Sequence, residues 1–236
     1  MDRRIVEIRG IRLFSEIKNR FVQAGGFDES REGDRYMMEK AFAGKTEEDF
    51  SVKAVFSFFE AEAFQGDRLY IRESGKAVSC RYFERIPEET VEGAFFYGMG
   101  VFQKESRQDG SPVEMVLRDL LGTAAADAGR VFLRSVLKQD MERRFLGQDF
   151  ILSASFGPGF YGMPTSETET VFSLLNLSEI GMKLNGSFVM SPEKSCCGLY
   201  LILNRKPDEE AEPCVFCKGD TGSCRLCAVF AKAPAQ

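Results

Sequence analysis

SASFGPGFYGMPTSETETVFSLLNLSEIGMKLNGSFVMSPEKSCCGL, residues 153–199, joins a glycine-rich turn directly to a helix start and then to short apolar strands. Glycine permits positive φ and lets a ligand approach the main chain, whereas proline restricts the backbone. Two interpretations are open for this turn: a tight connection between a strand and a helix, or a loop that binds a ligand. Its glycines and prolines are Gly157, Pro158, Gly159, Gly162 and Pro164.

Hydrophobic spacing on both sides of the turn predicts a mixture of helices and strands that does not alternate regularly. This mixture favours the α+β class over α/β. Helices are expected at residues 11–24, 34–42, 112–146 and after Ser166. Strands are expected around residues 56–59 and at 69–72, 77–82, 93–102, 150–155, 188–190 and 197–203.

Capping residues support two of these helices. Ser111 is the expected N-cap of the long helix, with Pro112 at its first position and Glu114 three residues after the cap. This segment is either one helix or two helices with a break near Gly122. Ser166 and Glu169 have the spacing of a second capping box.

Composition limits the function. The chain has 236 residues, a formal net charge of −5 and no histidine. Its acidic balance argues against nucleic-acid binding, because phosphate recognition needs clustered Lys and Arg. No apolar run is long enough to span a bilayer and the N-terminus has no signal-peptide pattern, so a cytoplasmic location without membrane association is expected. Without histidine, Ser-His-Asp catalysis and His-ligated zinc are excluded, and a bound cofactor or cosubstrate is expected to supply any chemistry.

The order of residues after the turn resembles the activation (reactivation) domain of vitamin B12-dependent methionine synthase, and most of all its stand-alone, single-domain relatives. Clear similarity covers residues 110–203, while residues 1–105 match only in their general element pattern. The residues that carry the resemblance are Pro158, Gly159, Pro164, Ser166, Glu167, Phe172, Leu174, Leu175, Ile180, Gly181, Leu184, Ser187, Met190, Pro192, Lys194, Ser195 and Gly198.

The resemblance implies a twisted antiparallel sheet flanked by helices, and a domain that binds S-adenosylmethionine. Such a domain holds the methyl donor over a cobalamin or other corrinoid that has slipped to Co(II). The partners implied are a corrinoid protein or the core of methionine synthase, and a flavodoxin-like or ferredoxin-like electron donor. The chain would then be an accessory methyl-transfer domain, with no catalytic residue of its own assigned.

By the same resemblance, the donor-binding residues are expected in the turn. The sequence departs from the family pattern at two places: the family's Arg is Ser155 here, and its Tyr after Pro-Gly is Phe160, with Tyr161 adjacent. Serine offers a hydroxyl in place of a charged fork for the carboxylate of the donor. The expected binding residues are Ser155, Gly157, Pro158, Gly159, Phe160 and Tyr161.

Two further motifs have open interpretations. Lys194 is expected to be a solvated strand end, with contact to the corrinoid or its carrier as the alternative. Cys196 and Cys197 are expected to be small packing residues. At the C-terminus, C-x2-C-x6-C-x2-C is typical of a metal site for zinc or an iron–sulfur cluster, with free thiols as the alternative. Its ligands are Cys214, Cys217, Cys224 and Cys227.

The chain therefore divides into an activation-domain-like part, residues 1–205, and a polar linker with the cysteine-rich metal-binding tail, residues 206–236. The leading hypothesis is reductive reactivation of a corrinoid with S-adenosylmethionine. Two alternatives are a binding module that docks on a corrinoid protein without transferring methyl, and a redox protein that uses the cysteine tail for electron transfer.

Overall fold

The structure, a computed structural model, describes residues 2–104 and 111–205. Within these ranges, seven strands form one antiparallel sheet in the order β4-β3-β2-β5-β9-β6, with β1 paired to β2. A separate hairpin joins β7 (Lys183–Leu184) to β8 (Met190–Ser191). The strands of the sheet are β1 (Arg3–Ile8), β2 (Phe50–Gln65), β3 (Arg68–Ile71), β4 (Lys76–Ser79), β5 (Val91–Gln103), β6 (Ile151–Phe156) and β9 (Ser195–Leu203).

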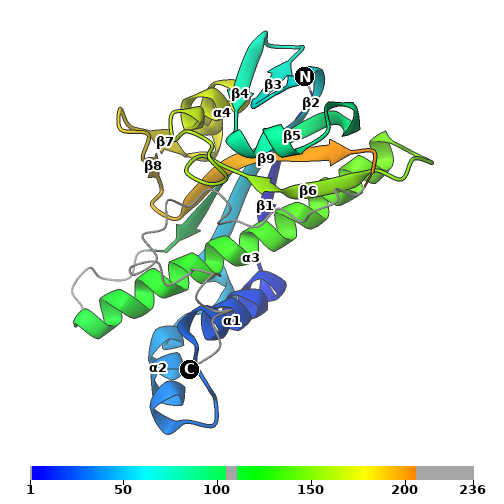
Figure 1. The fold of residues 1–236 in the computed structure, drawn as a ribbon. Coiled ribbons are helices and arrows are strands. Elements are labelled where there is room, and N and C mark those ends of the chain that lie inside the picture. Colours follow the sequence, from blue (N-terminus) through cyan, green and yellow to red (C-terminus); the bar gives the residue numbers. More distant parts are fainter. Residues whose placement is uncertain (1, 105–110, 206–236) are drawn as a thin grey trace, which may run out of the picture.

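Helices cover both faces of this sheet (Figure 1). The long helix α3 crosses one face, and α1 and α2 pack beside it, whereas α4 lies on the opposite face. The helices are α1 (Ile11–Gly25), α2 (Glu32–Phe42), α3 (Pro112–Arg144) and α4 (Glu167–Leu175). The expected α+β class and the antiparallel sheet flanked by helices are confirmed.

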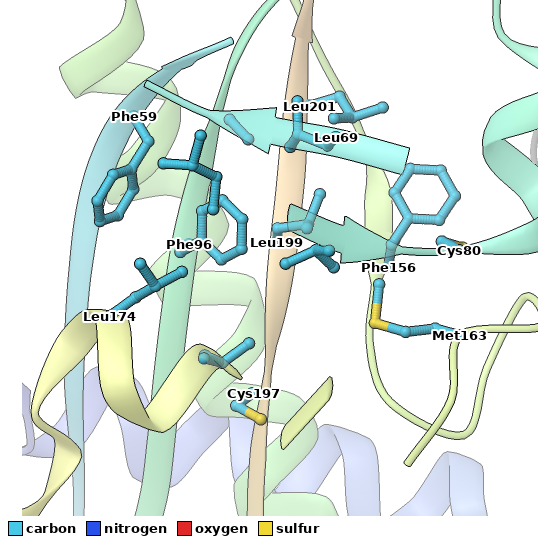
Figure 2. Packing of buried hydrophobic residues seen from close by; sticks show 14 of the residues in the cluster. Phe59, Leu69, Cys80, Phe96, Phe156, Met163, Leu174, Cys197, Leu199 and Leu201 are labelled. Carbon is cyan, nitrogen blue, oxygen red and sulfur yellow. The ribbon is translucent and has the colours of Figure 1, made fainter. Parts of the chain in front are cut away.

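The central strand β5 has a buried core on each of its faces. Phe95, Tyr97 and Met99 point to the α3 face, and Ala94 and Phe96 point to the α4 face. Figure 2 shows the α4-face cluster, in which Phe96 lies among residues of β2, β9 and α4. Burial on both faces explains why residues 93–102 are apolar throughout instead of alternating with polar residues.

The expected ends of the first and third helices are confirmed. Gly26 ends α1 in the left-handed conformation, with φ 62°. At the start of α3, the amide of Glu114 donates to the Ser111 hydroxyl at 3.4 Å, and the Ser111 amide donates to the Glu114 carboxylate at 2.7 Å. The helix then continues without a break through Gly122. A Cβ at Gly122 would lie 2.9 Å from Cγ of Lys194, so this glycine makes room for that side chain.

Three local expectations are wrong. Ser166 makes no cap with its side chain, because it already has helical angles and the chain begins to coil at Pro164. The strand expected at residues 77–82 ends at Ser79, and the chain continues into the 3-10 helix Arg81–Arg85. There the amide of Tyr82 donates to the carbonyl of Tyr161 at 3.1 Å instead of to a neighbouring strand. Phe188 has φ 61° and lies in the turn between β7 and β8 instead of in a strand.

The part of the chain that the structure describes contains no helix that is both long and apolar enough to cross a membrane. The linker and the tail cysteines Cys214, Cys217, Cys224 and Cys227 lie outside the described residues.

Candidate functional site

The structure places Ser155 on β6, facing α3, in a group of polar side chains that we call the α3 polar cluster. Strand pairing sets its position: Ser155 is opposite Tyr200 of β9, and the next strand, β5, brings Tyr97 to the same face. Cys196 lies earlier on β9. Helix α3, which packs on this face of the sheet, contributes the acidic residue Asp127 and the basic residue Arg130. The cluster consists of Tyr97, Asp127, Arg130, Ser155, Cys196 and Tyr200.

Hydrogen bonding and ring packing connect the sheet side of the cluster. The Tyr97 hydroxyl and the Ser155 Oγ are 2.7 Å apart, and either atom can be the donor. The Tyr97 and Tyr200 rings pack with their centroids 5.4 Å apart. Both tyrosines are almost fully buried, whereas Ser155 and Cys196 are partly exposed. The cluster therefore has a buried aromatic floor and a polar edge that solvent reaches.

Burial keeps the sheet side of the cluster neutral. It raises the pKa of Tyr97 well above the usual value for a phenol, and it also raises the pKa of Tyr200. Burial raises the pKa of the Cys196 thiol to about 11. At neutral pH these groups are thus hydrogen-bonding partners without charge, and the thiolate that nucleophilic chemistry requires is not formed.

The helix side of the cluster carries the charge. Arg130 Nη2 lies 2.9 Å from Asp127 Oδ1, one turn earlier on α3. Burial works against the charged guanidinium, but the carboxylate of Asp127 raises the pKa of Arg130 above its ordinary value. Arg130 is therefore a permanent cation at the edge of a neutral polar surface.

Arg134, one turn further along α3, positions the strand that carries Ser155. Its Nη1 donates to the carbonyl of Ser153 at 2.6 Å and its Nη2 donates to the carbonyl of Leu152 at 2.9 Å. The guanidinium also lies 5.3 Å from the centroid of the Tyr200 ring. These carbonyls are at the bulge where the register of β6 shifts. Arg134 thus donates hydrogen bonds to backbone carbonyls at the point where the pairing between β6 and β9 is irregular.

The glycine-rich turn after β6 is closed by its own backbone. The amide of Gly159 donates to the carbonyl of Met163 at 3.0 Å, and the amide of Phe160 donates to the carbonyl of Gly157 at 3.0 Å. These two amides are used within the turn and are therefore not available to a ligand. One side of Gly159 is open: a Cβ added there would meet only Thr165 Cγ2, at 3.9 Å.

The two aromatic residues of the turn point to different environments. Phe160 is 61% exposed at the tip. Tyr161 is 8% exposed and belongs to the α4-face core, with its ring centroid 5.0 Å from that of Phe156 and 5.6 Å from that of Tyr82. Ser155 and Tyr161, which the sequence analysis placed in one site, therefore lie on opposite faces of the sheet.

Two of the glycines are required by the protein's own strands. A Cβ at Gly157 would lie 2.8 Å from the carbonyl oxygen of Cys197, and a Cβ at Gly198 would lie 2.1 Å from that of Phe156. The end of β6 and the middle of β9 thus approach too closely for side chains. Pro158, between Gly157 and Gly159, is partly buried. The strand-to-helix interpretation of the turn accounts for Gly157, and the open side of Gly159 leaves room for a ligand or partner.

Lys194 is not the solvated strand end that was expected. Its Nζ lies 2.5 Å from Asp119 Oδ1 and 3.2 Å from Thr123 Oγ1, both on α3. It therefore attaches the segment before β9 to the helix. The neighbouring Cys197 is buried in the α4-face core, as expected for a packing residue, and burial raises its thiol pKa to about 12.

Ser155 is predicted as a site residue from the sequence, whereas the groups that surround it are not. Tyr97 and Tyr200 each place a hydroxyl among the apolar residues of a long strand, which was a visible signal. Asp127, Arg130 and Arg134 are spaced three and four residues apart, so they form a polar stripe on a helix rich in small residues. Among the described residues, no group of three or more acidic or cysteine side chains is arranged to hold a metal ion.

No protein-family model matches this sequence, and no curated protein matches it either. Among solved structures, the chain is similar to a crystal structure of the MetH reactivation domain bound to AdoHcy, with a TM-score of 0.57 and 14% sequence identity. The match covers 89% of this chain and 81% of that chain. The likeness shows a shared fold over most of the length of this chain.

Proposed function

We propose that this chain binds S-adenosylmethionine and presents its methyl group to a Co(II) corrinoid carried by a partner protein. The observation that carries the proposal is the fold likeness to a domain solved with AdoHcy. The order of motifs in residues 158–198 resembles the same type of domain and supports it independently. The polar surroundings of Ser155 support it: this position, which the resemblance assigns to the methionyl end of the donor, lies 2.7 Å from the Tyr97 hydroxyl on the sheet face that α3 covers.

The reaction requires no acid or base from the protein. One electron from a donor protein reduces Co(II) to Co(I), and Co(I) attacks the sulfonium methyl group. A cobalt–carbon bond forms and the sulfur–carbon bond breaks, with the electron pair going to sulfur, so that S-adenosylhomocysteine leaves. No proton moves, which is compatible with a chain that lacks histidine. The contribution of the protein is to hold the methyl group in line with the cobalt.

The exposed tip of the turn after β6 is where a partner protein would reach the bound donor. Phe160 and the open side of Gly159 face outward at the end of β6, beyond Ser155 on the same strand. A donor bound by its amino-acid end at the α3 polar cluster would extend along this edge, where a partner protein has access. The exposed Phe160 ring would then contact the partner or its corrinoid.

Donor-dependent methylation is the first expected result. When the protein is mixed anaerobically with a Co(II) corrinoid protein, a reductant and S-adenosylmethionine, the cobalt spectrum should convert to the methylated form. The matched control replaces the donor by S-adenosylhomocysteine, which has no methyl group to transfer. Equal conversion with either compound, or none with S-adenosylmethionine, would contradict the proposal.

One observation favours a second candidate, a module that docks on a corrinoid protein without transferring methyl. Ser155 provides no charged fork for a carboxylate, and Tyr97 already occupies its hydroxyl at 2.7 Å. Isothermal titration calorimetry with S-adenosylmethionine distinguishes the two candidates. Measurable binding of the donor favours methyl transfer, whereas binding of the corrinoid protein alone favours the docking module.

A metal site in the cysteine tail remains a prediction. The metal would be zinc as a structural ion, or an iron–sulfur cluster as an electron relay. Anaerobically purified protein should contain stoichiometric zinc or iron, and an iron–sulfur cluster would also absorb visible light. A chain that ends at Arg205 serves as the comparison. If it retains full donor-dependent methylation, the tail is not an essential electron relay and the redox alternative is excluded.

A further inference from the structure

In the described part of the chain, β1, β4 and β6 lie at the edges of the main sheet. An edge strand presents unpaired amides and carbonyls, and proteins usually protect it by keeping it short, bulging it or covering it. Strand β4 has only four residues. Strand β6 shifts register between Leu152 and Ser155, and Arg134 covers its carbonyls at Leu152 and Ser153. Strand β1 is longer and has neither protection.

The outer edge of β1 is regular. The strand pairs with β2 in one continuous register from Arg3 to Ile8, and within residues 2–104 and 111–205 no strand pairs with its other side. Every second residue of a strand directs its amide and carbonyl away from a given neighbour. Half of the six residues of β1 therefore direct these groups outward. Ile5, in the middle of the strand, is 54% exposed.

Side chains of β1 hold the strand in place from both faces of the sheet. On the α4 face, Arg3 Nη1 donates to the carbonyl of Leu175 at 3.1 Å. On the α3 face, Arg4 Nη1 lies 2.7 Å from Asp140 Oδ1. Both arginines are thus drawn toward the protein's own groups and leave the backbone edge open. The edge of β1 is therefore fixed in position and accessible to a partner strand.

The sequence of β1 is complementary to itself when two copies run antiparallel. A two-fold axis through Ile5 places this residue opposite Ile5 of the second copy, and Arg3 opposite its Glu7. Opposite residues must share a face, so only shifts of two residues are compatible with this symmetry. Such a shift places Arg4 opposite Arg4 in one direction, and Ile5 opposite Glu7 in the other. Charge therefore selects the register centred on Ile5.

We propose that the outer edge of β1 is an interface between two copies of this chain, whose sheets join through antiparallel pairing of β1 with β1. Backbone hydrogen bonds, the contact between the two Ile5 side chains and two Arg3–Glu7 ion pairs hold the copies together. One strand of six residues from each copy makes a small contact, so the dimer should dissociate in the micromolar range.

This interface is independent of the proposed function. Ser155 is on β6, and β5 and β9 separate that strand from β2 and β1. A corrinoid protein would therefore still have access to the β6 edge in each copy.

Sedimentation velocity of the full-length chain tests the interface, under reducing conditions so that cysteines do not cross-link the copies. The wild type should be mainly dimeric at about 100 µM and dissociate on dilution to about 1 µM. Ile5→Lys places two ammonium groups opposite each other and should raise the dimer dissociation constant about 10-fold or more. Val189→Lys is the matched control, because Val189 is 60% exposed and lies outside the main sheet, between β7 and β8. It should dimerise as the wild type does.

A mixture of two charge variants tests the register. Arg3→Glu alone and Glu7→Arg alone place like charges opposite each other, so each should be monomeric. An equimolar mixture brings opposite charges together at both positions and should form a heterodimer. The inference is overturned, and the proposed function stands, if the wild type is monomeric at about 100 µM or if Ile5→Lys dimerises like the wild type. A mixture that stays monomeric also overturns it, provided that circular dichroism shows both variants folded. If either charge variant folds poorly, Ile5→Lys decides the matter.

Discussion

Replacing Asp140 by alanine is expected to lower the free energy of unfolding by about 2–4 kcal/mol, because it removes the buried acid at the centre of a partly exposed ion network. The Asp140 side chain is only 3% exposed. Its Oδ1 lies 2.7 Å from Arg4 Nη1, and its Oδ2 lies 2.8 Å from Arg144 Nε. The network also includes Asp2, which binds Arg144. It attaches the N-terminal strand β1 to the end of α3.

The expected loss is below that of a fully buried pair because Arg4 and Arg144 remain partly exposed and can be hydrated. Urea unfolding followed by circular dichroism measures it. Glu142→Ala is the matched control: this exposed acid on the same helix pairs with Lys138 at 4.0 Å and should change stability by less than about 0.5 kcal/mol. Equal stability of the two variants would show that the network does not hold β1 and α3 together.

Replacing Gly198 by alanine is the second substitution with a large expected effect. The new Cβ would lie 2.1 Å from the carbonyl oxygen of Phe156 and 3.0 Å from the Cα of Gly157, both backbone atoms that no side-chain rotation can move away. Strand β6 would have to separate from β9. We expect a loss of about 2 kcal/mol or more from overpacking and backbone strain, and weaker ligand binding because Ser155 is on the displaced strand.

Gly186→Ala is the control for this substitution. A Cβ there has no atom within 4 Å, so the variant should be as stable as the wild type or slightly more stable. Thermal unfolding of both variants, combined with the calorimetric titration, measures the two effects together. A Gly198→Ala protein with unchanged stability would mean that β6 and β9 are not held as closely as the structure places them.

The sequence alone determined the features that depend on residues near each other in the chain. The spacing of Leu13, Phe14, Ile17 and Phe21 and the glycine that follows defined α1, and Ser111 with Glu114 defined the start of α3. The apolar run of residues 93–102 defined the central strand. These signals are local because helix periodicity and capping act over three or four residues, and burial of a strand on both faces leaves an unbroken apolar run.

Only the tertiary structure decided which of the polar residues meet. Ser155 and Tyr161 are six residues apart but lie on opposite faces of the sheet, because the chain turns between them at the end of β6. Ser155 meets Tyr97 and Arg134 meets Tyr200 through strand pairing and helix packing over long chain separations. Such contacts depend on the register between strands and on where α3 crosses the sheet, and both are set by the burial of the whole core.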